Sequence, residues 1–167
     1  MNPVLENIHS RRAVRLFSSQ TIPRDTMQEI INAGNAAPSG LNMQKWRFTV
    51  IDNPAIRRKF TELTIPQYKA WLAKAPAEVQ KMRAEVDKQV DDPVYYSAAA
   101  VVFVIGHGMA KDLECPLVCQ NMMLAARSLG IGSCWVHMGQ LALANAEIRK
   151  LLEIKEGETV YGPVIFG

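Results

Sequence analysis

Two apolar stretches near the middle of the 167-residue chain limit the folds that it can adopt. The run from Ala98 to Gly106, AAAVVFVIG, is almost continuously apolar, which is typical of a strand buried on both faces. From Asp112 to Leu129 the sequence indicates a helix that is apolar almost all round, so we expect it at the centre of the molecule or of a dimer. These two elements predict an α+β fold with helices on both faces of a small sheet.

The other predicted elements alternate irregularly, and helices outnumber strands. Apolar spacing predicts helices within residues 23–37, 55–65 and 143–154, and strands within 46–52, 130–138 and 159–167. The first of these helices is expected to end near Gly34, and Gly130 is expected to cap the long apolar helix. No repeat, low-complexity segment or linker divides the sequence, so residues 1–167 are predicted to form a single domain.

Between Lys69 and Asp92 the chain is unusually charged, with ten charged residues among 24. Val79, Met82 and Val86, with Val90, form a thin apolar stripe at helical spacing. We therefore predict a solvated, mobile helix in this part of the chain.

Composition excludes several classes of protein. The net charge of +3 is too small and too dispersed to predict a nucleic-acid partner. No apolar run approaches the roughly 20 residues of a membrane helix, and the first residues lack the apolar core of a secretory signal, so we expect a cytoplasmic protein without membrane contact. The cysteines are expected to be reduced thiols, and the histidines lack metal-ligand spacing, which predicts no metal site: Cys115, Cys119, Cys134, His9, His107 and His137.

Two clusters of polar residues could carry chemistry. In SRRAVRLF, residues 10–17, three arginines lie within five positions, and the planar guanidinium suits phosphate and flat polar edges. In APSGLNMQKWRF, residues 37–48, Pro and Gly shape an irregular backbone, while Ser, Asn and Gln offer donors and acceptors ahead of a strand. Considered separately, the first cluster is better explained by a solvated basic turn, and the second by a turn that precedes a strand.

Taken in order, four motifs resemble those of the FMN-dependent nitroreductase family. They are SRRAVRLF at 10–17, APSGLNMQKWRF at 37–48, GIGSCW at 130–135 and PVIFG at 163–167. The resemblance spans nearly the whole chain and depends on the order and spacing of the motifs. It implies a three-layer α/β/α fold with a small, mixed but mostly antiparallel sheet, in an intertwined homodimer with two FMN sites at the subunit interface.

The resemblance also implies which residues hold the cofactor. Arg11 would bind the phosphate, and Arg15 would face the N1/O2 edge of the ring, where its charge would stabilise the anionic reduced flavin. The second motif would come from the other subunit, and a backbone N–H of His137 or Met138 would donate to the N5/O4 edge. The full set of implied cofactor-binding residues is Arg11, Arg12, Ala13, Arg15, Pro38, Ser39, Gly40, Asn42, Gln44, Trp135, His137 and Met138.

Three departures from the family pattern bear on this site. Ala13 stands where relatives usually have Ser, so one hydroxyl contact to the phosphate is missing. His137 and Met138 stand where glycines are common, which predicts either narrower access to N5 or a gained substrate contact. Relatives continue beyond the position of Gly167 into a tail with further Lys or Arg contacts; either this site has fewer phosphate contacts or that tail lies outside the sequence.

By resemblance, the expected activity is hydride transfer from NAD(P)H through flavin N5 to an electron-poor aromatic acceptor such as a nitroaromatic or a quinone. No side chain is expected to act as nucleophile, acid or base, although His137 is a secondary candidate for a proton donor. Residues 67–92 are expected to form a mobile lid, with Tyr68 and Trp71 stacking on the substrate. A flavin store or redox-responsive binder without reductase activity is the alternative, and a cofactor-free interaction module is a third, less favoured one.

Overall fold

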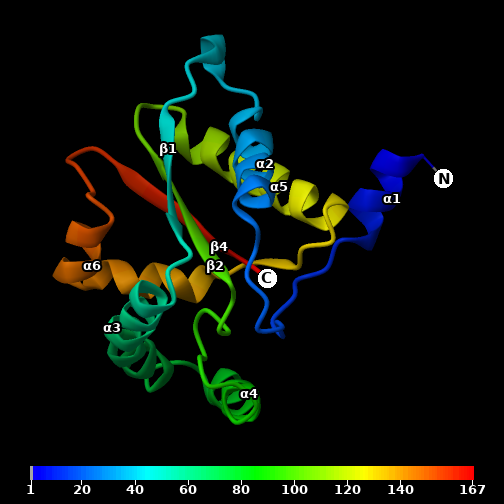
Figure 1. Cartoon of the computed structure of the whole chain (residues 1–167). Helices are drawn as coiled ribbons and strands as arrows, with labels where there is room; N and C mark the ends of the chain where they lie inside the picture. Colours follow the sequence, from blue (N-terminus) through cyan, green and yellow to red (C-terminus); the bar gives the residue numbers. More distant parts are fainter. Residues whose placement is uncertain (1) are drawn as a thin grey trace.

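The structure, a computed structural model, describes residues 2–167 and contains three layers (Figure 1). The strands are β1 (Trp46–Ile51), β2 (Ala100–Gly106), β3 (Ser133–Trp135) and β4 (Thr159–Phe166). The α-helices are α1 (Pro3–Ser10), α2 (Arg24–Asn35), α3 (Pro54–Leu72), α4 (Ala77–Asp87), α5 (Lys111–Ser128) and α6 (Ala146–Leu151), with 3-10 helices η1 (Gly40–Asn42) and η2 (His137–Ala144).

The four strands form one sheet in the order β1-β2-β4-β3, and every pair of neighbours is antiparallel. The prediction of a mostly antiparallel sheet is confirmed. Among the described residues the parallel pairing is confined to a single bridge, between Ala13 and Ser133. This bridge fixes the segment after α1 alongside the edge strand β3.

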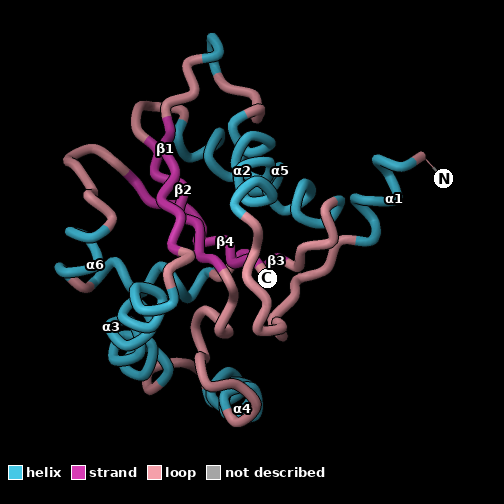
Figure 2. The backbone as a smooth tube through the Cα atoms, in the orientation of Figure 1, coloured by secondary structure: helices cyan, strands magenta, loops and turns pink. Residues whose placement is uncertain are grey.

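Strand β2 has both faces covered, as its apolar sequence predicts. Val101, Phe103 and Ile105 belong to a core cluster shared with α3, η2 and α6. The alternate residues Val102 and Val104 belong to a second cluster, shared with α2 and α5. Figure 2 shows the sheet lying between these two groups of helices, so the three-layer α/β/α architecture is confirmed.

Asparagine caps and glycine turns account for several helix boundaries. The side chain of Asn53 accepts hydrogen bonds from the N–H groups of Ala55 and Ile56, and Pro54 occupies the first turn of α3, where its missing N–H costs nothing. Gly130 follows α5 with a φ of 76°, which confirms the predicted left-handed cap.

The single solvated helix predicted between Lys69 and Asp92 is wrong in two respects. Helix α3 continues to Leu72, and a separate helix, α4, begins at Ala77 after a break that ends at Pro76. The buried residue of α4 is the charged Arg83, whereas Met82 from the predicted apolar stripe is 60% exposed. Hydrogen bonds of Arg83 therefore attach α4 to the body of the protein, together with the partly buried Val86, which packs against the core.

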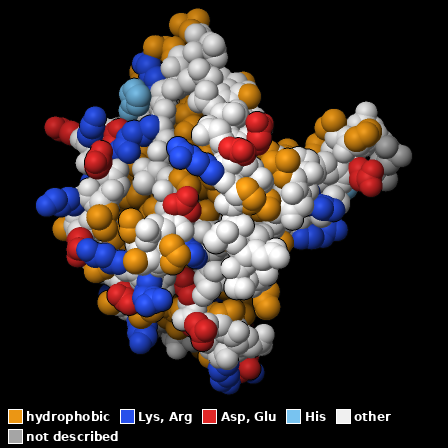
Figure 3. Space-filling view, viewed as in Figure 1, with side chains coloured by type: hydrophobic (Ala, Val, Ile, Leu, Met, Phe, Trp, Pro, Cys, Tyr) orange, Lys and Arg blue, Asp and Glu red, His pale blue; other side chains and the backbone are white. Residues whose placement is uncertain are grey.

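Helix α1 projects from the rest of the chain (Figure 1), and hydrophobic side chains cover much of it in the space-filling view (Figure 3). Val4, Leu5 and Ile8 are 65%, 50% and 43% exposed. One polypeptide therefore leaves an apolar surface of α1 open to solvent.

Candidate functional site

The first candidate site, the apolar hollow, has a volume of about 410 Å³ and lies between β3 and α4. It is lined by Arg15, Met82, Arg83, Val86, Tyr96, Cys134, Trp135, Val136, His137 and Met138. Four residues predicted from the sequence to bind a flavin ring thus meet here, although they come from two segments far apart in the chain. The charged side chains of this lining are Arg15 and Arg83, and no carboxylate lines the hollow.

The second candidate site, the basic hollow, has a volume of about 360 Å³ and lies at the opposite end of β3. It is lined by Ser10, Arg11, Arg12, Val14, Arg127, Gly130, Ile131, Gly132, Ser133 and Gly167. The Nε of Arg127 donates to the hydroxyl of Ser10 at 3.1 Å, and Nη1 of Arg12 donates to the carbonyl of His9 at 2.6 Å. Three guanidinium groups in one hollow suit a phosphate.

The two hollows adjoin each other where the backbone of the N-terminal segment pairs with β3. The N–H of Val14 donates to the carbonyl of Ser133 at 2.9 Å, next to the bridge between Ala13 and Ser133. Arg11 and Arg15 consequently lie on either side of this pairing, one in each hollow. Burial raises the pKa of the Cys134 thiol, although both arginines act to lower it.

The polar segment at 38–44 lies away from both hollows, at the tip of the molecule where η1 is found (Figure 1). None of its residues lines either hollow. Within one chain the structure therefore brings together the first and third motifs but not the second. The contribution of this segment to the other subunit's site stays a prediction.

Internal hydrogen bonds hold this segment in a strained conformation. The Gln44 side chain donates to the carbonyl of Asn35 at 2.7 Å, and its backbone N–H donates to Ser39 Oγ at 3.0 Å. The N–H of Gly40 donates to Oε1 of Glu114 at 2.8 Å. Positive φ values at Leu41, Asn42 and Gln44 (53°, 54° and 46°) are unusual for residues other than glycine. Strain of this kind clusters at functional sites.

Tyr68 and Trp71, the residues predicted to stack on the substrate, lie on the last turns of α3 and outside the lining of the apolar hollow. Tyr68 is 2% exposed, and its ring lies 6.3 Å from that of Trp71, which is 36% exposed. The Tyr68 hydroxyl donates to Oδ2 of Asp87 at 2.6 Å and accepts from Nε of Arg83 at 2.9 Å. Tyr68 is thus engaged within the protein, and a direct substrate contact would have to come from Trp71.

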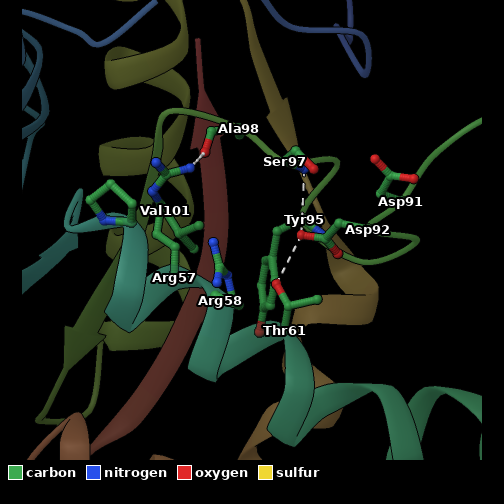
Figure 4. Close-up of a pocket in the computed structure, with 10 residues that line it drawn as sticks. Arg57, Arg58, Thr61, Asp91, Asp92, Tyr95, Ser97, Ala98 and Val101 are labelled. Carbon is green, nitrogen blue, oxygen red and sulfur yellow. Dashed lines mark hydrogen bonds between the residues drawn. The ribbon is translucent and has the colours of Figure 1, made fainter. Parts of the chain in front are cut away.

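A third hollow, of about 400 Å³, lies between the start of α3 and the turn that leads into β2 (Figure 4). Arg57 donates to the carbonyl of Ala98, and the hydroxyl of Thr61 donates to Asp92 at 2.9 Å. None of the predicted site residues lines this hollow, and its polar groups mainly tie the turn to α3.

Sequence reasoning missed two arginines near the candidate site. Arg127 occupies the last turn of an otherwise apolar helix, and its position shortly before the GIGSCW motif was the available signal. Arg83 lies within a charged segment whose composition suggested exposure. Residues 2–167 contain no group of three side chains placed to hold a metal ion, and none of the helices they form is long and apolar enough to cross a membrane.

Comparison with known proteins gives consistent matches over the whole chain. The model of the Nitroreductase family matches residues 8–167. A relative from Archaeoglobus fulgidus, named as an NADH dehydrogenase/NAD(P)H nitroreductase, is 27% identical and covers 100% of this chain and 86% of its own. The crystal structure of a Bacteroides fragilis nitroreductase with bound FMN is 32% identical, with a TM-score of 0.80, and covers 100% of this chain and 88% of that one. Iodotyrosine deiodinase 1 of Mus musculus is 24% identical over 75% of this chain and 49% of its own.

Proposed function

Because the chain belongs to the Nitroreductase family, we propose that it is an FMN-dependent oxidoreductase that uses NAD(P)H to reduce electron-poor aromatic acceptors. The observation that carries this proposal is the pair of adjoining hollows, one basic and one apolar, on either side of the Ala13–Ser133 bridge. FMN has the same division between a charged phosphate and a flat aromatic ring.

The basic hollow fits the phosphate end of FMN. Arg11, Arg12 and Arg127 supply positive charge, and no acidic side chain is among the lining residues. Charge-assisted hydrogen bonds from guanidinium groups are stronger than neutral ones. They compensate for the hydroxyl that Ala13 does not provide.

The apolar hollow fits the ring. Trp135 and Val136 offer apolar surface, and Arg15 offers the positive charge that suits the N1/O2 edge. Helix η2 begins at His137, and the first N–H groups of a helix have no acceptor within it, so they are free to donate to a ligand. When bound there, FMN would supply hydride transfer between a nicotinamide and an aromatic acceptor.

The rest of the proposed site comes from a second copy of the chain. Segment 38–44 projects from the body and exposes Leu41 by 95% and Met43 by 53%, while Asn42 is also exposed. Helix α1 exposes a second apolar surface. In the proposed homodimer these surfaces are covered, and Asn42 and Gln44 reach the ribityl chain and phosphate of the neighbouring site.

The residues of this chain then have distinct tasks. Arg11 and Arg127 bind the phosphate, Arg15 places positive charge at the pyrimidine edge, and His137, exposed at the mouth of the apolar hollow, is available to deliver a proton to an acceptor. The apolar lining excludes water from the place where hydride would move.

Anaerobic flavin reduction tests the proposal. Purified protein, reconstituted with FMN if necessary, is mixed with NADH or NADPH and followed by absorbance of the flavin. We expect bleaching at a catalytic rate and reoxidation by menadione or a nitroaromatic. A protein that cannot retain FMN contradicts the flavin assignment itself.

The alternative function is a flavin store or redox-responsive binder. Ala13, without a hydroxyl, and the bulky His137 and Met138 favour it, because they change positions that relatives keep small or hydroxylated. Retention of FMN without reduction by either nicotinamide would support this alternative. Adding 3-iodotyrosine to the acceptors in the same experiment tests the chemistry named for the mouse relative.

A further inference from the structure

Arg83 is the buried residue of α4 and contacts three separate parts of the chain. It is 6% exposed. Its Nε donates to the hydroxyl of Tyr68 at 2.9 Å, and its Nη1 donates to the hydroxyl of Tyr96 at 2.8 Å. Its Nη2 donates to Oδ1 of Asp87 at 2.9 Å and to the carbonyl of Pro93 at 2.6 Å. A single guanidinium thus links α3, α4 and the turn at 92–97.

Aromatic rings and a carboxylate complete the surroundings of this guanidinium. Its central carbon lies 5.3 Å from the ring centroid of Tyr68 and 6.0 Å from that of Tyr96, within the range of a cation–π contact. Burial and the hydrogen bond to Asp87 raise the pKa of Tyr68, so its hydroxyl stays protonated and continues to donate. Lysine could not form the same set of bonds, because it lacks the planar fork of arginine.

The turn at 92–97 is held from its other side by Asp92. Oδ1 of Asp92 accepts from the N–H groups of Val94 and Tyr95 at 3.0 and 2.9 Å, and Oδ2 accepts from Thr61 (Figure 4). Tyr96 and Ser97 have positive φ values of 56° and 51°. Such a conformation persists only where the surroundings over-determine it. Asp92 and Arg83 together provide those surroundings.

This arrangement decides what faces the apolar hollow. Met82, Arg83 and Val86 line it from α4, and Tyr96 lines it from the turn; most of the remaining lining comes from residues 134–138. The 92–97 turn is anchored in the core, because Val94, Tyr95 and Tyr96 are buried in the cluster that includes Val101 and Phe103 of β2. Helix α4 is anchored less, since Arg83 is its only buried residue among those described and Val86 is a partly buried side chain packed against the same cluster. The position of α4 at this side of the hollow therefore depends on the bonds that Arg83 makes to the turn and to α3.

We propose that Arg83 is a positioning residue that holds α4 to the core-anchored 92–97 turn at the edge of the apolar hollow and thereby sets the affinity for the aromatic acceptor. The inference depends on the proposed function for the identity of the ligand. Under this proposal Tyr68 does not stack on the substrate. Its hydroxyl instead accepts a hydrogen bond from Arg83 and so acts on the hollow indirectly.

The test uses the full-length FMN-loaded protein and two variants, Arg83→Lys and Tyr68→Phe. Arg83→Lys removes the planar guanidinium group and keeps the positive charge. Tyr68→Phe removes only a buried hydroxyl and keeps the aromatic ring. Hydrogen exchange of residues 77–87 is compared with wild type. The flavin is then reduced anaerobically with one equivalent of dithionite, so that no reductant is left to react with menadione. The menadione concentration that gives a half-maximal rate of flavin reoxidation is measured. Because dithionite replaces NAD(P)H as the reductant, this measurement does not depend on the proposed nicotinamide reaction. A failure of that reaction would appear only in the anaerobic reduction by NADH or NADPH described above.

In both variants we expect faster exchange in α4 and a rise of about tenfold in the half-maximal menadione concentration. For Tyr68→Phe, whose side chain lies outside the hollow, we also expect a maximal rate and an FMN affinity close to those of wild type. Lys88→Met is the matched control, because it removes an exposed cation next to the same helix, where Lys88 pairs with Glu85. Unchanged menadione dependence in Tyr68→Phe, or faster exchange without any change in menadione dependence, would overturn the proposal. If Arg83→Lys does not fold, Tyr68→Phe alone decides.

Discussion

Single residues in the segment 38–44 combine exposure with a strained backbone. Asn42 has a φ of 54° and an exposed side chain, whereas its neighbours Ser39 and Gln44 are tied by hydrogen bonds inside the chain. Asparagine adopts this conformation more readily than most residues, so its presence has a conformational explanation as well as a chemical one. The two explanations can be separated by substitution.

We expect Asn42→Ala and Asn42→Gly both to weaken FMN binding by about threefold to tenfold, the effect of one hydrogen bond of roughly 0.5–1.5 kcal/mol. Glycine relieves the backbone strain and alanine does not, so only alanine should also lower the free energy of unfolding. Flavin fluorescence titration and urea unfolding measure the two effects. Normal FMN affinity in Asn42→Gly would mean that Asn42 serves only the turn.

At this scale the sequence predicted side chains with local signatures and missed those defined by tertiary contact. Arg15 and His137 were predicted from motifs, and both line the apolar hollow. Arg83 was missed because a charged residue in a charged segment resembles a surface residue; only the fold brings Tyr68 and Tyr96 to its sides. Tyr68 was assigned to the substrate on its position and on the composition of the segment, and its burial was not apparent from the sequence.

Among the elements, α2 and α5 pack closely because Gly34 lies at their contact. A Cβ built on Gly34 would lie 2.7 Å from Cγ of Met122 and 3.3 Å from Cγ1 of Val118. Both neighbours are completely buried, so neither has room to move aside. The close approach of the helices thus depends on the absence of a side chain.

We expect Gly34→Ala to destabilise the protein, although alanine favours a helix by about 1 kcal/mol, because overpacking costs typically about 1–3 kcal/mol. Urea unfolding measures the change. Combining it with Met122→Ala should cost less than the sum of the two single substitutions, since the second change vacates the space that the new methyl group needs. A more stable Gly34→Ala variant would show that propensity dominates here.

Elements with strong apolar patterns were predicted well, and elements with polar attachment were not. Strand β2 and helix α5 were expected close to where they lie, because their apolar runs are long and unambiguous. Strand β2 is buried throughout, whereas α5 leaves Leu113 and Leu117 exposed in this chain. The division of 69–92 into the end of α3 and α4 was missed, since charge alone does not mark the break before Pro76. Helix α6 is also shorter than the predicted 143–154, because η2 occupies the first residues of that range.

For the whole molecule, the central feature is the separation within one chain of the residues proposed to bind one flavin. Arg11 lies in the basic hollow, while Asn42 lies at the distant tip that includes η1 (Figure 1). Motif order predicted both groups, and the family resemblance implied that they come from different subunits; their separation within one chain was visible only in the fold. The proposed dimer joins Arg11 of one chain to Asn42 of the other.

Mixed dimers test this arrangement. Arg11→Ala and Asn42→Ala chains, each impaired in FMN binding, are co-expressed with different tags or mixed to allow exchange. We expect random exchange to restore about a quarter of the sites, because half of the dimers are mixed and each of these has one intact site. Flavin content per chain is the measurement, and size-exclusion chromatography is the control. Flavin content no higher than the mean of the two parents would place both residues in the same chain's site.

The three cysteines give the folded chain a further property. Cys115 and Cys119 are fully buried and Cys134 is 2% exposed; burial raises the pKa of Cys115 to about 11 and of Cys119 to about 12. Thiolates are the reactive form, so at neutral pH these groups are both protonated and inaccessible to an alkylating reagent. Cys115 and Cys119 lie on α5 in the core cluster shared with α2, whereas Cys134 lies on β3 and lines the apolar hollow. The alkylation rates of Cys115 and Cys119 therefore report how often α5 separates from the sheet, so the native sequence carries its own probe of this local opening.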